Sequence, residues 1–446
     1  MQEFIKPEIL SGFMELLPED QVLFDRIKAT IERNFQTYGF WPLDTPAIEK
    51  SEVLLAKGGG ETTKQIYRID KEGSSQDQAL RFDLTVPLAR FVAQHASELA
   101  FPFRRYQIAK VYRGERSQKG RYREFYQCDI DIIGRDQLSL MNDAEIPSVI
   151  DHIFSELGIS TLRFHMNNRR LLNGFFQSIG IKNCTETLRS IDKLAKIGQE
   201  KVNALLEEAG VTKDQQQQIE EFLHQPEDSQ ELLEQIEKKY LTKAPIPEEM
   251  LQGYRELKEV YERMQEFGIP KERIRIDLSI TRGLDYYTGT VYESFLDGYQ
   301  SLGSVCSGGR YDDLASNFSK EHLPGIGLSI GLTRLFYQLR SQRIVEPDRG
   351  DYLKVLVIPM GEEQFSYGIR VVNLLRQQGI RSQIYSESGK MKKKFSYADQ
   401  VGTQFAFILG ETEAAEEKIS VKNLRTGDQE TLSWEEAVAL LSKKDR

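Results

Sequence analysis

Residues 110–131 read KVYRGERSQKGRYREFYQCDID, two runs of alternating side chains joined by a basic loop. Successive side chains of an extended chain point to opposite faces, so the second run divides into two sets. One set suits a hydrophobic core and consists of Tyr126, Cys128, Ile130 and Ile132. The other set consists of Phe125, Gln127, Asp129 and Asp131. Carboxylates and an amide opposite a core face predict the floor of a cleft, and an antiparallel sheet with one solvated face is the alternative.

The first run, Arg105 to Arg113, also alternates, so the two runs together predict a β-hairpin. Its loop, Gly114 to Tyr122, places Glu115 among several cations. Arginine forks match phosphate oxygens in two-point geometry. A basic loop beside an acidic, amide-lined floor therefore suits a nucleotide phosphate next to an amine, although a solvated turn would have the same composition.

The hairpin and other segments, in order along nearly the whole chain, resemble the histidyl-tRNA synthetase family of class II aminoacyl-tRNA synthetases. The hairpin with Arg113, Glu115, Phe125 and Gln127 is similar to motif 2 of that class. The stretch RGLDYYTGTVYE, residues 282–293, resembles the histidine-specific signature. The other matches are GFWPLDTPAIE at 39–49 (motif 1, with Pro46), LRFDLTVP at 80–87, SGGRYDDL at 307–314 and GIGLSIGLTRL at 325–335 (motif 3, with Arg334).

The resemblance implies an α+β catalytic domain over residues 1–340, built on an antiparallel sheet of the class II synthetase type. It also implies a helical insertion at about 185–268 and a C-terminal anticodon-binding α/β domain over 351–446. Residue patterns agree, because Leu188, Ile191, Leu194 and Ile197 follow helical spacing. Apolar runs at 355–358 and 405–409, with an amphipathic stretch at 364–378, predict buried strands and a helix.

The activity that the resemblance implies is ligation of L-histidine to its cognate tRNA. ATP-dependent formation of histidyl-adenylate releases pyrophosphate, and transfer to the 3′ end of tRNA(His) follows. Arg113 and Arg282 are the implied catalytic residues, and the implied ATP-binding residues are Arg113, Glu115, Phe125 and Arg334. Mg²⁺ would accompany ATP, and the glycines of GIGLSIG would let ATP approach the strand closely.

Histidine recognition requires partners for both imidazole nitrogens and for the α-amino group. By resemblance, the histidine-binding residues are Asp83, Thr85, Gln127, Asp131, Tyr286 and Tyr287, the first three at the α-amino group. Gly308 and Gly309 would leave room for the ring. Candidate tRNA-binding cations are Arg116, Lys119, Arg121 and Arg123, with KMKKK at 390–394 as a second basic patch or a solvated helix start.

Composition excludes several other classes. The 446 residues carry 59 Lys and Arg against 68 Asp and Glu, a net charge of −9, whereas proteins that coat RNA nonspecifically are basic. No apolar run reaches the roughly 18 residues of a membrane span, and the start MQEFIKPEIL lacks the pattern of a signal peptide, so a cytoplasmic location is expected. Three scattered cysteines and five histidines predict no metal held by the protein alone. Motif 1 implies a homodimer.

Two alternatives remain open at this point. Paralogues of the family act as non-catalytic regulatory subunits of an ATP phosphoribosyltransferase and generally lack the anticodon domain, and a sheet-based RNA-binding protein without catalysis is the other. This chain also departs from the family pattern. Thr333 stands where a glutamate is common, and Asp83 and Asp131 stand where some members have glutamate.

Overall fold

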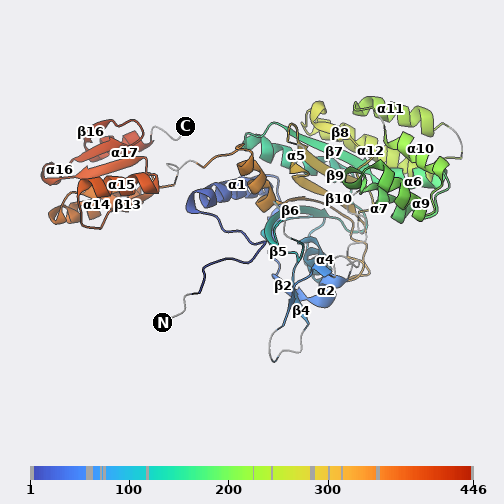
Figure 1. Ribbon diagram of the computed structural model, residues 1–446, viewed down its shortest axis with the longest axis horizontal. Helices are drawn as coiled ribbons and strands as arrows, with labels where there is room; N and C mark the ends of the chain where they lie inside the picture. The colour runs from blue at the N-terminus through green and yellow to red at the C-terminus, as the bar shows by residue number, and fades with distance from the viewer. Residues whose placement is uncertain are drawn as a thin grey trace. The chain divides into compact units, whose positions relative to one another are not determined.

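The computed structural model describes residues 5–56, 64–70, 73, 77–116, 120–224, 226–242, 245–281, 287–299, 302–312, 315–347 and 352–442. The chain divides into two compact units (Figure 1). The first consists of Met1–Glu15 and Arg26–Ile344, and the second of Leu16–Asp25 and Val345–Arg446. Helix α1 (Pro18–Thr37) therefore contributes residues to both.

Within the described residues, an eight-stranded sheet forms the centre of the first unit, in the order β1-β5-β6-β11-β10-β9-β7-β8. The strands are β1 (Trp41–Pro42), β5 (Phe103–Tyr112), β6 (Glu124–Ile133), β7 (Leu162–Asn168), β8 (Ile274–Ile276), β9 (Thr290–Leu296), β10 (Cys306–Tyr311) and β11 (Gly325–Ile330). The outer pairs β1–β5 and β7–β8 are parallel, and every inner pair is antiparallel. The predicted antiparallel catalytic sheet is confirmed.

Strands β5 and β6 form the predicted hairpin, with Arg105 opposite Asp131 and Tyr112 opposite Glu124. The apolar face of β6 is a core face, because Cys128, Ile130 and Ile132 are completely buried. The other face carries the amide and the carboxylates, as alternation requires. The two faces of the second run are therefore those that its sequence predicts.

Helices cover the core side of the sheet. Helix α5 (Met141–Glu156) contacts β7 and β11, and α12 (Glu248–Glu266) packs on both α5 and α6 (Arg169–Ser178). The α6–α12 crossing is close, since a Cβ at Gly174 would lie 2.2 Å from the Met250 nitrogen and one at Gly253 would lie 2.1 Å from the Leu171 nitrogen. With this face covered, the other face of β6 is left to form the cleft.

The segment expected to be helical contains helices in its described part. They are α7 (Cys184–Ile191), α8 (Leu194–Ile197), α9 (Gln199–Glu208), α10 (Lys213–Leu223) and α11 (Ser229–Tyr240), followed by α12. These helices gather beside β7 and β8 in Figure 1, and α11 contacts β8. The alternation that runs from Ile274 to Ile280 in the sequence gives only a short strand, because β8 ends at Ile276 and a turn closed by Asp277 and Ser279 follows.

A smaller three-stranded sheet of β2 (Ile48–Lys50), β4 (Gln78–Leu80) and β3 (Arg68–Ile69) lies with α2 (Ser51–Leu55) and α4 (Thr85–His95). The Val86 N–H at the start of α4 donates to Asp83 Oδ1 over 3.1 Å. A carboxylate at this position satisfies a free N–H of the first helical turn. Asp83 and Thr85 are therefore fixed by the beginning of α4.

The second unit contains a five-stranded sheet, in the order β13-β12-β14-β15-β16 within the described residues. The strands are β12 (Val355–Pro359), β13 (Ser382–Ile384), β14 (Phe405–Leu409), β15 (Ile419–Asn423) and β16 (Gln429–Leu432). The helices are α14 (Phe365–Gln377), α15 (Met391–Val401), α16 (Glu411–Glu416) and α17 (Trp434–Ser442). Both predicted strands and the predicted helix are present, so the α/β prediction is confirmed.

The basic run at the start of α15 is only partly a surface patch. Lys394 is 3% exposed, and its ammonium donates to the Pro359 carbonyl oxygen over 2.6 Å. This lysine therefore satisfies the end of β12 and does not face solvent. Lys390 and Lys393 remain exposed.

Candidate active site

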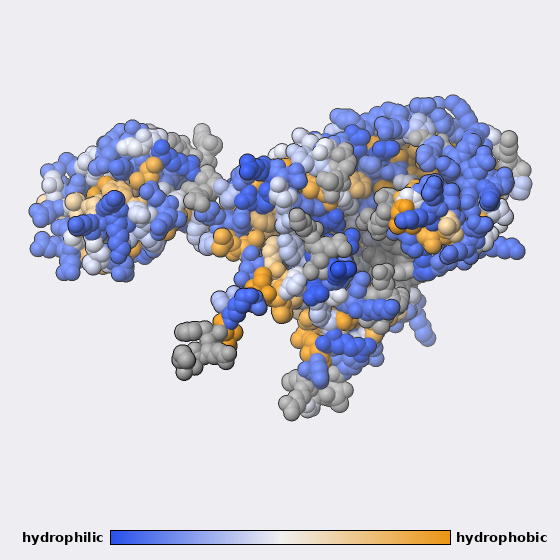
Figure 2. Space-filling view, viewed as in Figure 1, coloured by the Kyte–Doolittle hydropathy of each residue, from blue (hydrophilic) through white to orange (hydrophobic). Residues whose placement is uncertain are grey.

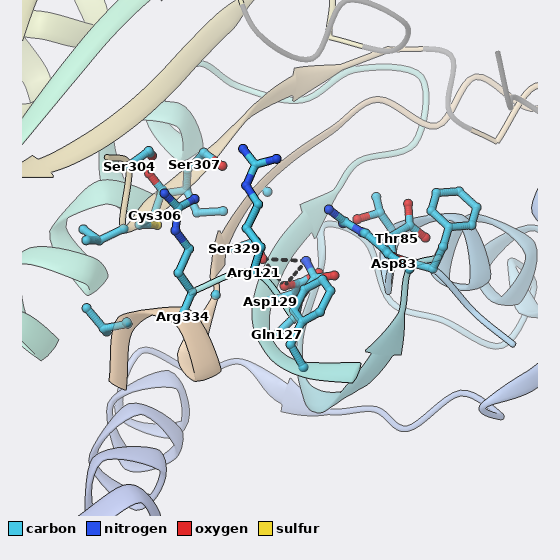
Figure 3. A pocket seen from close by; sticks show the side chains of 18 of the residues that line it. Asp83, Thr85, Arg121, Gln127, Asp129, Ser304, Cys306, Ser307, Ser329 and Arg334 are labelled. Atoms are coloured by element: carbon cyan, nitrogen blue, oxygen red, sulfur yellow. Dashed lines mark hydrogen bonds between the residues drawn. The ribbon is translucent and has the colours of Figure 1, made fainter. Parts of the chain in front are cut away.

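A cavity of about 490 Å³ opens on the polar face of the hairpin. It lies among β6, β10 and β11 and the first turns of α4 and α13 (Leu332–Ser341). The predicted site residues that line it are Asp83, Thr85, Arg113, Glu115, Arg121, Phe125, Gln127, Asp131, Tyr287 and Arg334. In Figure 3, Arg334 lies on one side of Gln127 and Asp129, and Asp83 and Thr85 lie on the other.

Two of the described predicted residues, Arg116 and Arg123, are not among the lining residues of this cavity. Arg116 is exposed, and Arg123 uses its Nε to donate to the Glu115 carbonyl oxygen over 3.0 Å. Arg123 therefore holds the hairpin loop, and its tRNA contact stays a prediction. Lys119, Arg282 and Tyr286 lie outside the described residues.

One end of the cavity presents arginines and an aromatic ring. The Arg113 guanidinium lies 5.1 Å from the centre of the Phe125 ring, and its Nε donates to the Phe82 carbonyl oxygen over 3.0 Å. Arg334 donates to the Leu302 carbonyl oxygen over 2.9 Å. A backbone carbonyl fixes the orientation of each guanidinium, and a guanidinium can bind a phosphate in two-point geometry. We call this part, with Glu115 and Arg121, the arginine end.

The unusual threonine of motif 3, Thr333, lies in the first turn of α13. The Thr333 hydroxyl accepts a hydrogen bond from the Tyr126 N–H over 2.8 Å, and the residue is 2% exposed. This bond ties the helix that carries Arg334 to β6. Thr333 therefore has a structural role that does not depend on a charge.

The opposite end is built around Asp131. One carboxylate oxygen lies 2.7 Å from Nη2 of Arg105, and the other accepts from the Tyr311 hydroxyl over 2.8 Å. The Arg105 side chain is 0% exposed, and its Nε and Nη1 have no hydrogen-bond partner among the described residues. Because each carboxylate oxygen can accept more than one bond, Asp131 can still receive an imidazole N–H. We call this part, with Asp83 and Asp129, the acidic end.

The sequence interpretation missed Arg105 and Tyr311. Arg105 resembles an ordinary polar residue of an alternating strand, next to another arginine. The hairpin register sets Arg105 opposite Asp131, and that register is fixed by structural pairs such as Arg113 with Arg123. Tyr311 comes from β10, and no local pattern connects it with β6.

Burial changes the ionisation of the acidic end. It raises the pKa of Asp83 to about 6, against the opposing effects of the Val86 N–H and of Arg113. It raises the pKa of Asp129 to about 7, although Arg105 favours the charged form. Burial also raises the pKa of Asp131, and Arg105 and the Tyr311 hydroxyl oppose this. Three carboxyls share one buried cation, so an incoming ammonium would find acceptors with little competing positive charge.

A hydrogen-bond network crosses the floor between the two ends. Gln127 Nε2 donates to the Ser329 hydroxyl over 2.9 Å, and that hydroxyl donates to Asp129 (Figure 3). Ser329 lies opposite Asp129 in the β11–β6 register. The sequence interpretation placed Asp129 on the floor of the cleft without a specific role, and it assigned no role to Ser329.

Two glycines shape the acidic end. A Cβ at Gly327 would lie 2.1 Å from Asp131 Oδ1, so this glycine of GIGLSIG makes room for the carboxylate. The close approach of ATP to the glycines of this stretch stays a prediction. A Cβ at Gly309 would lie 3.2 Å from the Tyr287 ring. Gly309 therefore leaves room for the tyrosine that faces the cavity.

The chain was also compared with known proteins. The family model described as Histidyl-tRNA synthetase matches residues 12–335, and the model described as Anticodon binding domain matches residues 354–444. A histidine–tRNA ligase of Clostridium tetani is 51% identical, covering 99% of each chain. That of Finegoldia magna is 48% identical, covering 98% of this chain and 100% of the relative.

Solved structures agree with these relatives. The crystal structure of histidyl-tRNA synthetase from Nostoc sp. PCC 7120 has a TM-score of 0.91 at 39% identity, covering 99% of this chain and 100% of that one. A Bacillus halodurans structure titled as an ATP phosphoribosyltransferase regulatory subunit/histidyl-tRNA synthetase has a TM-score of 0.74 over 92% of this chain and 99% of that one. At 20% identity it shows the fold alone. By sequence over its whole length, the chain belongs to the histidyl-tRNA synthetase family of class II aminoacyl-tRNA synthetases.

Proposed function

We propose that this cleft activates histidine with ATP at the junction of its two ends and then transfers the histidyl group to tRNA(His). The chain is an aminoacyl-tRNA ligase that charges tRNA with histidine, as its family membership establishes. The observation that carries the proposed site is that one cavity joins the arginine end to the acidic end. The proposed roles of individual residues follow from that geometry and from the family motifs.

At the arginine end, Arg113 holds the α-phosphate of ATP and Arg334 the γ-phosphate. The carboxylate of histidine attacks the α-phosphorus, and pyrophosphate leaves with the electrons of the broken P–O bond. An anion attacks a polyanion in this step, so fixed cations lower the barrier by electrostatic stabilisation. Arg282, which lies outside the described residues, is the further cation proposed at the reacting phosphorus.

The adenine base is proposed to stack on Phe125, with Glu115 near its exocyclic amine. Arg113 already covers one face of the Phe125 ring, so the base would use the other face. Glu115 lies 3.5 Å from the Arg121 guanidinium, which leaves its carboxylate able to accept another hydrogen bond.

At the acidic end, Asp131 and Tyr287 are proposed to bind the two imidazole nitrogens, and Tyr286 belongs to the same recognition set. Asp83, Thr85 and Gln127 are proposed to bind the α-ammonium. A site that hydrogen-bonds a polar side chain rejects apolar amino acids by about 10⁴ or more, since they would leave its buried groups unpaired.

Mg²⁺ is the general cofactor of the family and is proposed to bind with ATP. The described residues contain no group of three or more His, Cys, Asp or Glu side chains that could hold a metal. Mg²⁺ in nucleotide sites takes most of its ligands from phosphate oxygens and water, so we propose that it binds together with ATP. When bound, Mg²⁺ would reduce the charge on the phosphates, and the arginines would position them.

The two units are proposed to divide the work. The catalytic domain is assigned to residues 1–340, with its helical insertion at about 185–268, and the anticodon-binding domain to residues 351–446. The compact units and the two family models support this division. Arg116, Lys119, Arg121 and Arg123 are proposed to contact tRNA near the cleft. Deleting residues 351–446 should then spare adenylate formation and impair aminoacylation.

A homodimer is proposed from motif 1. Its Trp41 is 71% exposed and its Ile48 is 48% exposed, although both are large hydrophobic residues. Figure 2 shows hydrophobic surface in the region of β2, β4 and α2. Such surface suits a contact with a second copy.

A cytoplasmic location is also proposed. No helix of the described part of the chain is long and apolar enough to cross a membrane.

Histidine-dependent exchange of pyrophosphate into ATP tests the proposed site. The purified chain should show exchange with L-histidine and none with phenylalanine or leucine. A non-catalytic regulatory subunit or a simple RNA-binding protein would show none with any amino acid. Absence of histidine-dependent exchange in the presence of Mg²⁺ would refute the proposal.

A further inference from the structure

The side-chain amide of Gln127 is held in one orientation. The residue is 8% exposed, and its Nε2 donates to the Ser329 hydroxyl over 2.9 Å and lies 3.5 Å from Asp129 Oδ1. Its Oε1 is buried and has no partner within the described part of the chain. Folded proteins pair nearly all buried polar atoms, so a buried acceptor that lines a cavity indicates a ligand donor.

The Ser329 hydroxyl determines which end of the amide faces the cavity. A hydroxyl has a single proton, and this one is donated to Asp129 Oδ1. Towards Gln127, the Ser329 oxygen can then act only as an acceptor, so it requires the NH₂ end of the amide. A rotated amide would place Oε1 against the serine lone pairs. The ionised Asp129 carboxylate therefore sets the direction of both hydrogen bonds, whereas the protonated carboxyl, whose pKa burial raises to about 7, could itself donate to Ser329.

Strand pairing makes this arrangement rigid. Ser329 and Asp129 face each other across β11 and β6, and Gln127 lies two residues from Asp129 on the same face. Asp129 is 3% exposed, and its Oδ1 accepts a hydrogen bond from the Ser329 hydroxyl. Asp129 also lines the cavity, and its hydrogen bond with Ser329 connects it to the Gln127 amide.

We propose that Asp129 and Ser329 are positioning residues, which hold the Gln127 amide with its oxygen towards the α-ammonium of histidine. The inference rests on the proposed function, which places that ammonium beside Gln127. A cation needs an acceptor, and the NH₂ end of the amide would repel it. The relay therefore contributes to recognition of the amino group and leaves recognition of the imidazole to other residues.

Two ligands that differ only in the amino group test this proposal. Calorimetry would measure the binding of L-histidine and of 3-(imidazol-4-yl)propionate, which lacks the amine. The ratio of their dissociation constants reports amine recognition. Ser329→Ala and Asp129→Asn should each reduce the wild-type preference for histidine by about tenfold or more, because a hydrogen bond to a charged group is lost or misdirected. Ser329→Thr, which keeps the hydroxyl, should retain the preference.

The outcomes separate the possible failures. Equal weakening of both ligands in Ser329→Ala would show a general structural role and overturn the inference. An unchanged ratio in that variant, with a reduced ratio in Asp129→Asn, would show that Asp129 contacts the ammonium directly and would also overturn it. If the unmodified enzyme binds neither ligand, the proposed function itself fails.

Discussion

The two ends of the cleft use charge in different ways. At the acidic end, the side chains of Arg105 and Asp131 are 0% and 3% exposed and lie 2.7 Å apart. At the arginine end, those of Arg121 and Glu115 are 51% and 27% exposed and lie 3.5 Å apart. A buried pair fixes geometry before a ligand arrives, whereas exposed cations remain available to a polyanion. The Arg105–Asp131 pair is thus fixed in place, whereas Arg121 stays exposed at the end that is proposed to bind the phosphates.

The largest effect is expected from breaking the buried pair. Arg105→Met leaves Asp131 buried with no cation beside it, which should lower the free energy of unfolding by about 3–5 kcal/mol. Urea unfolding followed by circular dichroism measures this loss. A loss below about 1 kcal/mol would contradict the view that Arg105 compensates the buried carboxyls.

Arg282→Ala should abolish most adenylate formation without destabilising the fold. Removal of one group that stabilises the transition state slows catalysis by about 10²–10³-fold. Histidine-dependent pyrophosphate exchange measures the rate, and thermal unfolding provides the control for folding. Exchange at close to the wild-type rate would show that Arg282 has another role.

The raised pKa of Asp83 predicts a pH dependence of stability. Because burial raises this pKa to about 6, the folded state holds the proton more tightly than the unfolded chain does. The Asp83 contribution to stability is therefore full below about pH 4 and decreases as pH rises towards 6. The contribution should stay about 3 kcal/mol lower above that pH, because burial raises the pKa from 3.8 to about 6 and each pKa unit corresponds to about 1.4 kcal/mol.

Asp83→Asn should remove this part of the pH dependence. The measurement is the difference in unfolding free energy between wild type and variant at pH 4 and pH 8, without ligands. The asparagine side-chain oxygen can still accept from the Val86 N–H, so the cap on α4 is kept at both pH values. A difference that does not change with pH would show that Asp83 titrates normally.

The smallest effect on stability is expected at the arginine end. Arg121→Ala removes an exposed ion pair, so the free energy of unfolding should change by less than about 1 kcal/mol. The KM for ATP should nevertheless rise, because Arg121 lines the cavity. A loss of stability as large as that of Arg105→Met would remove the distinction between the two ends.

Much of the fold follows from local sequence patterns. Alternation from Arg123 to Ile133 specifies both faces of β6, since side chains on a strand have a period of two. The apolar runs at 355–358 and 405–409 correspond to β12 and β14. Parallel strands of this kind are buried on both faces, so their sequences are continuously apolar. The alternating pattern did not predict the end of the strand at Ile276, where the Asp277–Ser279 turn follows.

The candidate site was less accessible to sequence reasoning. Residues that the family motifs contain, such as Gln127 and Asp131, line the cavity as expected. Arg105, Ser329 and Tyr311 act across strand pairs, so their roles depend on register and not on neighbours in the sequence. The assignments of Arg282 and Tyr286 remain predictions, because both lie outside the described residues.

The most direct measurement is a crystal structure with ATP and histidinol, which carries the imidazole and the amine but has no carboxylate to react. The two-ended cleft predicts the imidazole between Asp131 and Tyr287 and the phosphates on Arg113 and Arg334. Histidinol bound elsewhere, or phosphates at the acidic end, would contradict it.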